Sequence, residues 1–426
     1  MIRIMRVGEV KNEEIFARTE PAVHVEEIVA GIIDAVRREG DQAVLRYTER
    51  FDRAILASLA VSTEEIDEAV ASMDPAFLEI LREAAANIRA FHEKQKRTGF
   101  IINEQSGVVM GQKVIPIDRA GLYAPGGTAA YPSSVLMNAI PAKIAGCREV
   151  VLATPPGADG KVNPAILAAA SVAGIDRVFK MGGAQAIAAL AYGTESVPRV
   201  DKIVGPGNAF VTEAKKQVFG QVAIDMIAGP SEILIIADGK SNPVHAAADM
   251  LSQAEHDKMA SAVLVTDSMA LAERVSCELE RQIPLLERCA IARESIDVNG
   301  KIIVADDIRQ AIDIANGIAP EHLELCVDNP FDYLDAIRHA GSIFLGRNCP
   351  EALGDYFAGP NHILPTSGTA RFSSPLSVDD FVKKTQYTYF TRDALSRVAD
   401  KVARFAREEG LTGHAKSAVI RMETQA

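Results

Sequence analysis

The chain has 426 residues, more than one hydrophobic core usually organises, so we expect two large domains with smaller additions. Apolar residues make up 48% of the sequence and charged residues 24%, the balance of an ordinary globular protein rather than a disordered one. The formal net charge of −12 argues against non-specific nucleic-acid binding, because that mode needs clustered lysine and arginine to displace phosphate counterions.

The cysteines and the N-terminus indicate the cellular compartment. The segment that begins at Met1 lacks the apolar run of a signal peptide, and no stretch is apolar for long enough to span a bilayer. An odd number of widely spaced cysteines without a C-x-x-C pair is typical of reduced thiols in the cytosol. We therefore expect a cytoplasmic protein with no membrane partner. The five cysteines are Cys147, Cys277, Cys289, Cys326 and Cys349.

The N-terminal part of the chain is predicted to be helical after a short arm. Apolar residues recur at helical spacing from Val25 to Val36, and a second helical pattern covers Gln42 to Phe51. Ser62-Thr-Glu-Glu65 has the form of a capping box, which opens a third helix. Asp74-Pro75 is a typical start for a fourth helix, which we expect to reach about His92.

A different pattern runs from Val114 to about Ala228. Short β-branched runs such as Glu149–Ala153 alternate with alanine-rich helical segments, which implies βαβ units and a parallel sheet with helices on both faces. In an open parallel sheet, ligands bind at the carboxyl ends of the strands. Three glycine-containing turns stand between a strand and a helix at this edge: Tyr123-Ala-Pro-Gly-Gly, Met181-Gly-Gly-Ala-Gln185 and Gly205-Pro-Gly-Asn208.

A second series of strands and helices follows from Ile233 to Leu345. It has the same rhythm, with one helix predicted over Pro243–Ala254, so the chain is predicted to contain two α/β units of similar construction. Beyond Pro375 come a short polar stretch with Tyr387-Thr-Tyr389 and one amphipathic helix over Asp393–Glu409. So small a tail cannot bury much by itself, and we expect it to pack on another domain or another subunit.

Gln253 and His256 are the first candidates for a metal site. They are three residues apart at the end of a predicted helix, so they project from the same face and could hold one metal ion. The alternative is a helix end whose polar residues cap the helix or face solvent, since glutamine is an uncommon zinc ligand and H-x-x-x-H spacing is the stronger signal. Glu255 and Asp257 are then ordinary surface acids.

Three further histidines stand in polar surroundings. Glu321-His322 precedes a predicted strand, and an acid beside a histidine suits proton abstraction and water activation, although an ordinary polar turn is equally compatible. Asp355 and His362 share the glycine- and proline-rich stretch Gly354–Arg371, which is predicted to form a fixed, water-facing loop rather than a helix. His414 follows the terminal helix beside glycine. Each of these residues alone is more often structural or exposed.

Two other kinds of site are weakly supported. Gly205-Pro-Gly207-Asn208 carries the first two glycines of the dinucleotide motif G-x-G-x-x-G, but Phe210 occupies the third position, and tight turns explain these glycines equally well. A cysteine nucleophile would need an activating neighbour. Cys326 lies in an apolar predicted strand and Cys349 has no adjacent histidine, so we interpret the thiols as structural.

Taken together, the polar clusters resemble the L-histidinol dehydrogenase family. The resemblance covers nearly the whole chain in the family's order. It implies an NAD-dependent homodimer with one zinc ion per subunit, which oxidises L-histidinol through L-histidinal to L-histidine at the end of histidine biosynthesis. The motifs that carry it are Ala228-Gly-Pro-Ser231-Glu232, Ser252-Gln-Ala-Glu-His256-Asp257, Pro320-Glu321-His322-Leu323-Glu324, Gly354-Asp355-Tyr with Gly359-Pro-Asn-His362-Ile-Leu-Pro-Thr, and Gly410-Leu-Thr-Gly-His414.

The same resemblance implies a role for each site residue. Oxygen donors such as glutamine are acceptable because the family's metal is nearly octahedral and the substrate completes its shell. The implied zinc ligands are Gln253, His256, Asp355 and His414. The implied catalytic residues are Glu321 and His322. Besides the zinc ligands, the implied substrate contacts are Ser231, His322, His362 and Glu409. The implied NAD contacts are Tyr123, Gln185 and Asn208.

The predicted fold is α/β, with two incomplete Rossmann-like parallel-sheet domains, a helical N-terminal region and a small C-terminal helical tail. We expect an N-terminal arm (residues 1–20), a first large domain (21–122 with 232–375), an NAD-binding domain (123–231) and a C-terminal dimerisation segment (376–426). In the resemblance this last segment reaches across the dimer, so that each active site is shared between two chains.

Two competing functions are compatible with parts of the sequence. A zinc hydrolase could use the same metal ligands, but the sequence has no H-E-x-x-H motif, and the two α/β units favour a nucleotide site. A non-catalytic protein with two α/β lobes that binds a small molecule is allowed by composition alone. NADH formation from histidinol, measured before and after chelation, would separate the three.

Overall fold

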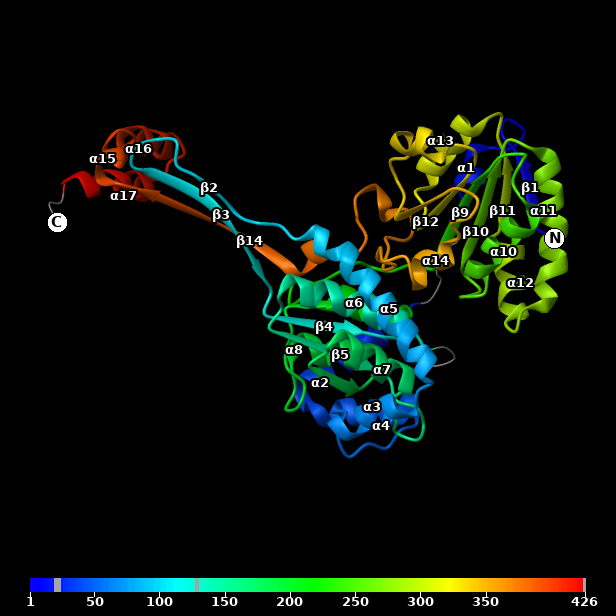
Figure 1. Cartoon of the computed structure of the whole chain (residues 1–426). Helices are drawn as coiled ribbons and strands as arrows, with labels where there is room; N and C mark the ends of the chain where they lie inside the picture. The colour runs from blue at the N-terminus through cyan, green and yellow to red at the C-terminus, as the bar shows by residue number, and fades with distance from the viewer. Residues whose placement is uncertain (19–23, 127–129, 424–426) are drawn as a thin grey trace. The chain divides into compact units, whose positions relative to one another are not determined.

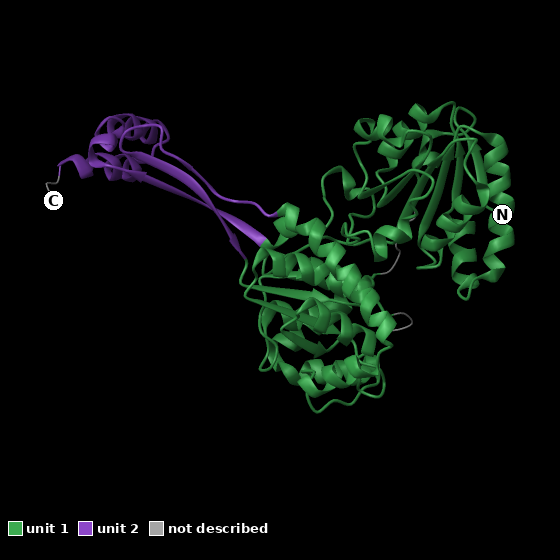
Figure 2. Ribbon diagram, in the orientation of Figure 1, with its two compact units in different colours: residues 1–95, 117–381 green, residues 96–116, 382–426 purple. Residues whose placement is uncertain are grey.

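The computed structural model describes residues 1–18, 24–126 and 130–423. Residues 19 and 20 of the predicted arm, Gly127 of the first glycine turn and residues 424–426 of the tail lie outside the described residues. The chain divides into two compact units (Figures 1 and 2). Unit 1 consists of residues 1–95 and 117–381, and unit 2 consists of residues 96–116 and 382–426.

One part of unit 1, which we name the five-stranded lobe, is built on a parallel sheet in the order β6-β5-β4-β7-β8. Its strands are buried on both faces, because Val150 and Leu152 of β5 belong to one hydrophobic cluster and Val151 and Ala153 to another. The strands are β4 (Arg119–Tyr123), β5 (Glu149–Thr154), β6 (Arg177–Lys180), β7 (Lys202–Val204) and β8 (Ala223–Ile224). The helices between them are α6 (Pro132–Ala145), α7 (Pro164–Ala173), α8 (Gly183–Tyr192) and α9 (Ala209–Val218).

The N-terminal helices pack on this lobe. They are α2 (Glu26–Glu39), α3 (Asp41–Asp52), α4 (Thr63–Ser72) and α5 (Pro75–His92). The predicted capping box is present, since the Ser62 side chain accepts from the Glu65 backbone and the Glu65 side chain accepts from Ser62. Helices α4 and α5 share a cluster with α6 and α7, while α2 and α3 share one with α8 and α9. The predicted grouping of residues 21–122 with 232–375 differs from this packing, and the full set of domain boundaries stays a prediction.

The other part, the six-stranded lobe, has a parallel sheet in the order β1-β11-β10-β9-β12-β13. Its strands are β1 (Arg3–Arg6), β9 (Glu232–Ala237), β10 (Ser261–Thr266), β11 (Lys301–Val304), β12 (His322–Cys326) and β13 (Ser342–Leu345). Its helices are α1 (Asn12–Phe16), α10 (Pro243–Ala254), α11 (Met269–Gln282), α12 (Cys289–Val298), α13 (Ile308–Ile318) and α14 (Glu351–Tyr356). The predicted bounds of α10 are those observed, whereas β1 lies in the segment that we expected to be only an arm.

Short 3-10 turns complete unit 1. They are η1 (Glu93–Gln95), η2 (Ile283–Leu285), η3 (Pro330–Ala336), η4 (Thr369–Arg371) and η5 (Val378–Phe381).

The two parallel sheets of unit 1, each with helices between its strands, confirm the predicted α/β class. No helix within the described residues has both the length and the apolar character needed to cross a membrane.

Unit 2 combines a long antiparallel ribbon with three helices. Strand β3 (Val108–Pro116) pairs on one side with β2 (Phe100–Ile102) and on the other with β14 (Val382–Phe390). The helices are α15 (Arg392–Ser396), α16 (Ala399–Glu408) and α17 (Thr412–Glu423). Two predictions are corrected here. The polar stretch around Tyr387 is a strand, and His414 lies inside α17 rather than after the last helix, because Gly410, with a φ of +75°, follows α16 and a new helix then begins.

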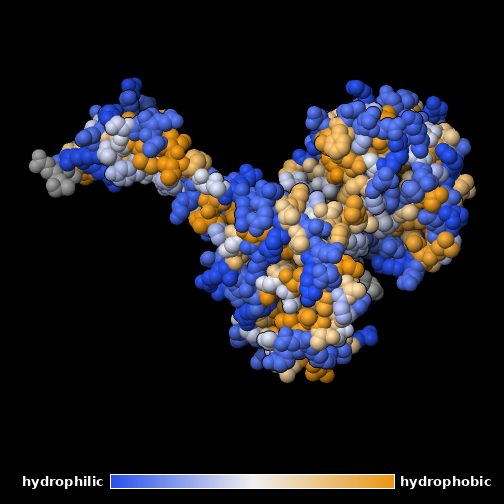
Figure 3. Space-filling view, viewed as in Figure 1, coloured by the Kyte–Doolittle hydropathy of each residue, from blue (hydrophilic) through white to orange (hydrophobic). Residues whose placement is uncertain are grey.

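Unit 2 has a small core and an exposed apolar surface. The buried residues of its helical cluster are only Ala403, Ala406 and Ala415. By contrast, Ile101 is 68% exposed and Phe405 is 69% exposed. Figure 3 shows hydrophobic residues gathered on the surface of this unit. Unit 2 therefore exposes large apolar side chains beside a small core.

Candidate metal and catalytic site

The candidate site of the six-stranded lobe is built at the amino-terminal ends of its central strands. His322 is the first residue of β12, and Glu232 is the first residue of the neighbouring strand β9. Gln253 lies in the last turn of α10, which follows β9 and returns the chain to this edge. Asp355 lies on α14. Four separate elements of the sheet and its helices therefore bring polar side chains to one place.

His322 is the centre of the cluster and is buried. Its Nδ1 lies 3.0 Å from the backbone oxygen of Glu232 and 3.2 Å from Nε2 of Gln253. Because a carbonyl oxygen can only accept, the Nδ1 proton points at Glu232 and the lone pair of the neutral ring is on Nε2. This Nε2 lies 3.4 Å from Oδ1 of Asp355 and has no hydrogen-bond partner among the described residues. Nε2 is therefore the ring atom through which His322 can exchange a proton at the site.

Glu321 stands beside His322 and is also buried. Its Oε2 accepts a hydrogen bond of 2.9 Å from the backbone N–H of Glu232 and lies 3.7 Å from Nδ1 of His322. Burial raises the pKa of Glu321 to about 8, although the charge of His322 opposes this. Burial alone would lower the pKa of His322, but the neighbouring carboxyl groups of Glu321 and Asp355 raise it above its usual value. Glu321 and His322 are thus a buried acid–base pair that can hold a proton away from bulk water.

Asp355 corrects the predicted loop. It lies in α14, which begins after Pro350, and the fixed loop starts only beyond Tyr356. Burial by itself raises the pKa of Asp355, but the nearby His322 ring and the charges of His362 and His256 lower it below the usual value. The pKa of His256 is lowered by burial, and Asp355 opposes this. Asp355 is therefore close enough to interact with three histidines.

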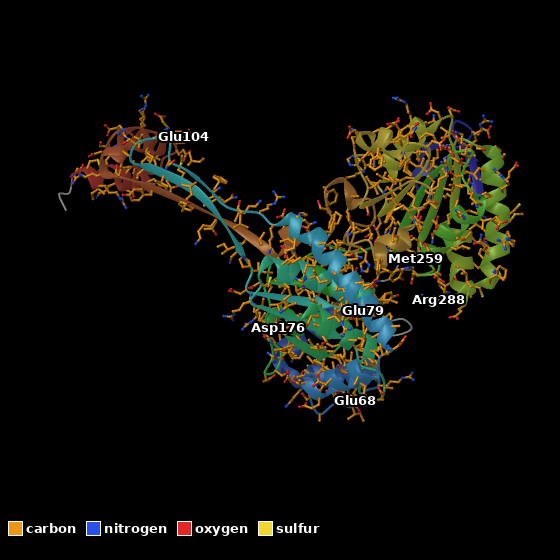
Figure 4. The ribbon with its side chains drawn as sticks, in the orientation of Figure 1. Glu68, Glu79, Glu104, Asp176, Met259 and Arg288 are labelled. Atoms are coloured by element: carbon orange, nitrogen blue, oxygen red, sulfur yellow. The ribbon has the colours of Figure 1, made fainter. Side chains whose placement is uncertain are left out.

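His256 follows α10 on a short turn whose backbone is fixed. Arg288, labelled in Figure 4, donates a hydrogen bond of 3.3 Å to the backbone oxygen of His256. The Asp257 carboxylate accepts from the backbone N–H of Met259 at 2.8 Å. His256 is thus presented by a turn held at both ends, and Asp257, which we interpreted as a surface acid, stabilises that turn.

His362 and Ser231 occupy defined positions around the cluster. Nδ1 of His362 donates to the backbone oxygen of Asp355 at 2.8 Å, and Nε2 accepts from the hydroxyl of Ser134 on α6 at 3.0 Å. Ser231 immediately precedes β9, and its backbone oxygen accepts from the N–H of Ser261 at 2.9 Å. Both residues are placed by backbone contacts, and their roles as substrate contacts stay predictions.

Glu351 is a site residue that the sequence did not indicate. One ligand atom each from His322, Glu351 and Asp355 lies within 4.8 Å of the others, which is the spacing of a metal site. Burial raises the pKa of Glu351 to about 7, although the charge of His322 opposes this. Glu351 has no local motif, because it is simply the first residue of a short helix. Only the packing of α14 on α10 and β12 reveals it.

The donor atoms fit a divalent cation. Oε1 of Gln253 and Nε2 of His322 are both buried without a hydrogen-bond partner among the described residues. Buried polar atoms are rarely left unpaired, so these two favour an additional group at the site. Nitrogen and oxygen donors of this kind suit zinc and similar ions. Of the predicted zinc ligands, Gln253, His256 and Asp355 lie in unit 1, and their roles stay predictions.

The remaining predicted ligand, His414, lies on α17 of unit 2, and the predicted substrate contact Glu409 follows α16 in the same unit. Both side chains are exposed. Their contribution to the site stays a prediction.

The predicted NAD residues lie at the carboxyl ends of the strands of the five-stranded lobe. Tyr123 ends β4, Gln185 lies in α8 after β6, and Asn208 caps α9 after β7. The strand order reverses between β4 and β7, which is where open α/β sheets bind ligands. The Tyr123 hydroxyl accepts from the Gly183 N–H at 3.1 Å, and burial raises its pKa to about 12. The arrangement suits a nucleotide, and the three contacts stay predictions.

A buried ion pair holds the glycine turn of this candidate cofactor site. Nζ of Lys215 donates to the backbone oxygen of Gly205 at 3.0 Å and pairs with Asp225, whose other oxygen accepts from the Gly205 N–H at 2.7 Å. Gly205 has a φ of +117°, and a Cβ there would lie 2.1 Å from the backbone oxygen of Tyr123. The sequence indicated the turn, but it gave no sign of Lys215 or Asp225.

Comparisons with known proteins agree on one family. A family profile described as "Histidinol dehydrogenase" matches residues 17–422. A histidinol dehydrogenase of Syntrophotalea carbinolica is 57% identical over 412 residues, which covers 96% of this chain and 95% of that protein. One of Clostridium acetobutylicum is 52% identical over 428 residues and covers 99% of each. The crystal structure of the histidinol dehydrogenase of Elizabethkingia anophelis superimposes with a TM-score of 0.94 at 38% identity, over 99% of this chain and 98% of that one. The chain therefore belongs to the histidinol dehydrogenase family.

Proposed function

We propose that the chain oxidises L-histidinol through L-histidinal to L-histidine, with NAD as the hydride acceptor and zinc as a resident ion. Membership of the family supports the substrate and the reaction. The observation that carries the proposal is the buried Glu321–His322 pair beside unpaired donor atoms of Gln253 and His322. Such a pair can move protons while the cofactor takes hydride.

We assign proton transfer to His322. Its Nδ1–H is fixed by the carbonyl of Glu232, so Nε2 is the atom that accepts a proton from the substrate hydroxyl. Glu321 is held by the backbone N–H of Glu232, and its raised pKa lets it exchange a proton near neutral pH. We assign to Glu321 the activation of water in the second oxidation, where the aldehyde needs an added oxygen atom. His322 then serves both oxidations and Glu321 only the second.

We assign the zinc ligands Gln253, His256, Asp355 and His414. When bound, zinc would orient the substrate and stabilise negative charge on its oxygen. The four side chains supply amide oxygen, imidazole nitrogen and carboxylate oxygen, all of which zinc accepts. Ser231, His362 and Glu409 are proposed to contact the substrate, and Tyr123, Gln185 and Asn208 are proposed to contact NAD.

We also propose a cytoplasmic homodimer with shared active sites. The exposed apolar side chains of unit 2, among them Phe100, Ile101 and Phe405, support a surface covered by a second copy. His414 and Glu409 belong to the same unit, so a covering partner could supply them to the other chain's site. The five cysteines form no disulfide, which supports a reducing compartment.

The test is NADH formation, followed by absorbance, with histidinol as substrate. The proposal expects about two NADH per histidinol, because each NAD takes one hydride and the full oxidation removes two. Dialysis against a chelator should abolish the reaction, and added zinc should restore it. A second amino alcohol without an imidazole ring serves as the control. Absence of NADH with histidinol would overturn the substrate assignment, while full activity in the zinc-free protein would overturn only the metal.

A further inference from the structure

Glu351 makes three contacts that concern the orientation of Gln253. Its side chain is 2% exposed. One carboxylate oxygen accepts from the hydroxyl of Ser252 at 3.1 Å, and the carboxylate is also in hydrogen-bonding contact with the side-chain amide of Gln253. Its backbone N–H donates to Oε1 of Glu324 at 2.8 Å. Glu351 therefore touches the residue before Gln253 in the chain as well as Gln253 itself.

The chemistry of the two side chains fixes the direction of the amide. A carboxylate only accepts hydrogen bonds, whereas the Gln253 amide has a donating NH2 end and an accepting oxygen end. The NH2 end must therefore face Glu351, and the oxygen must face away from it. Nε2 of Gln253 also lies 3.2 Å from Nδ1 of His322, but that ring nitrogen donates to Glu232 and offers the NH2 group no acceptor. Oε1, in contrast, is buried and has no partner among the described residues.

We propose that Glu351 is the positioning residue of the metal site, which turns the amide oxygen of Gln253 toward the ion. The inference rests on the zinc site proposed above. An amide binds cations through its oxygen and not through its NH2 group, so a reversed amide would remove one ligand. Most zinc ligands are oriented by a second residue in this way, and glutamine needs it more than histidine does because its two ends differ so little in shape.

The position of Glu351 is itself set by the elements that carry the site. Glu324 is two residues beyond His322 on β12, so both side chains project from the same face of the sheet. The Glu324 carboxylate accepts a hydrogen bond from the backbone N–H of Glu351, which is the first residue of α14. The Ser252 hydroxyl on α10 donates to the Glu351 carboxylate. The strand of His322 and the helix of Gln253 thus both fix Glu351.

The competing role is that Glu351 is itself a metal ligand, since its carboxylate belongs to the group with His322 and Asp355. The two roles differ in one respect. A residue that acts through Gln253 loses its effect when Gln253 is absent, whereas a direct ligand keeps its effect. A double-mutant cycle measures this difference.

The experiment measures the zinc dissociation constant by competition with a chromogenic chelator for four proteins: the wild type, Glu351→Gln, Gln253→Ala and the double variant. Glu351→Gln keeps the shape but can donate as well as accept, so it no longer selects one end of the amide. We expect it to weaken zinc binding by roughly 10–100-fold, the usual cost of losing an orienting partner. In the Gln253→Ala background the same change should weaken binding no further. Glu255→Gln, which removes a carboxylate two residues from Gln253, serves as the control and should leave zinc affinity unchanged.

Circular dichroism and thermal unfolding establish that each variant is folded, and Glu351→Ala repeats the test without a new side-chain amide. Losses that add in the double variant would overturn the inference in favour of a direct ligand. Unchanged zinc affinity in Glu351→Gln and Glu351→Ala would overturn it as well. A wild-type protein that binds no zinc would instead overturn the metal part of the proposed function, so the two failures are distinguishable.

Discussion

Oε2 of Glu321 lies 3.7 Å from Nδ1 of His322, on the side of the imidazole ring opposite to the free Nε2. The two groups can therefore take different parts in the reaction. If His322 serves both hydride steps and Glu321 activates water only for the aldehyde, Glu321→Gln should slow histidinal oxidation more than histidinol oxidation. General base catalysis contributes about 10²–10⁴-fold, which sets the expected loss in the second step. Single-turnover rates with each substrate measure it, and equal losses in both steps would contradict the division of roles.

His256→Ala should lose zinc and activity while the fold survives, because the side chain lies beyond the end of α10 and outside the hydrophobic clusters. Bound zinc is measured by atomic absorption and the fold by circular dichroism. His245→Ala changes an exposed histidine near the start of the same helix and should keep both zinc and activity. Full zinc occupancy in His256→Ala would remove His256 from the ligand set.

Asn208 has two roles that substitutions can separate. Its Oδ1 accepts from the backbone N–H groups of Phe210 and Val211 at 3.1 and 3.2 Å and so caps α9. Asn208→Ala should lower stability by about 1 kcal/mol through loss of the cap, and it should also raise the KM for NAD. Asn208→Asp keeps the cap but loses the amide donor and adds a negative charge, so it should raise the KM for NAD with little change in the melting temperature. An unchanged KM in Asn208→Asp would argue against a cofactor contact.

The shared site can be tested by mixing two inactive variants. A dimer of one His414→Ala chain and one His256→Ala chain would contain one site with both defects and one site with neither. Refolding the two variants together should restore activity to about a quarter of the wild-type level if chains pair at random, since half the dimers are mixed and each has one intact site in two. Persistent inactivity, with mixed dimers demonstrated by mass spectrometry, would show that His414 serves the site of its own chain.

Local signals in the sequence predicted several elements, although the single helix expected over Asp393–Glu409 is two helices, α15 and α16. The capping box at Ser62 and Glu65 and the helix Pro243–Ala254 are marked by residues next to them in the chain, and both are present. The β-branched runs likewise became the strands of two parallel sheets. Of the polar clusters, those that contain Gln253, His322 and Asp355 lie together in the six-stranded lobe, whereas the meeting of the His414 cluster with them stays a prediction.

Features that depend on distant partners were not predicted. Strand β1 is only four residues long, and what makes it a strand is its pairing with β11, which lies almost 300 residues later in the sequence. Strand β14 contains Lys383 and Lys384 and has an exposed face, so it lacks the apolar alternation of a half-buried strand. Glu351 and the Lys215–Asp225 pair have ordinary local surroundings and become notable only through burial. Tertiary packing decides all three cases.

The long ribbon of unit 2 has a consequence for the order in which the chain folds. Strand β3 pairs with β14 along its whole length, from Val108 with Phe390 to Pro116 with Val382, and residues 117–381 of unit 1 lie between them in the sequence. During synthesis β3 therefore emerges long before its partner strand exists, and it must wait until the ribosome has almost finished the chain. Until then the edge of β3 that pairs with β14 is open, in a sheet that also exposes the apolar residues Phe100, Ile101 and Ile102 of β2. We therefore expect a chain that is truncated before β14 to aggregate rather than to persist as a partly active fragment.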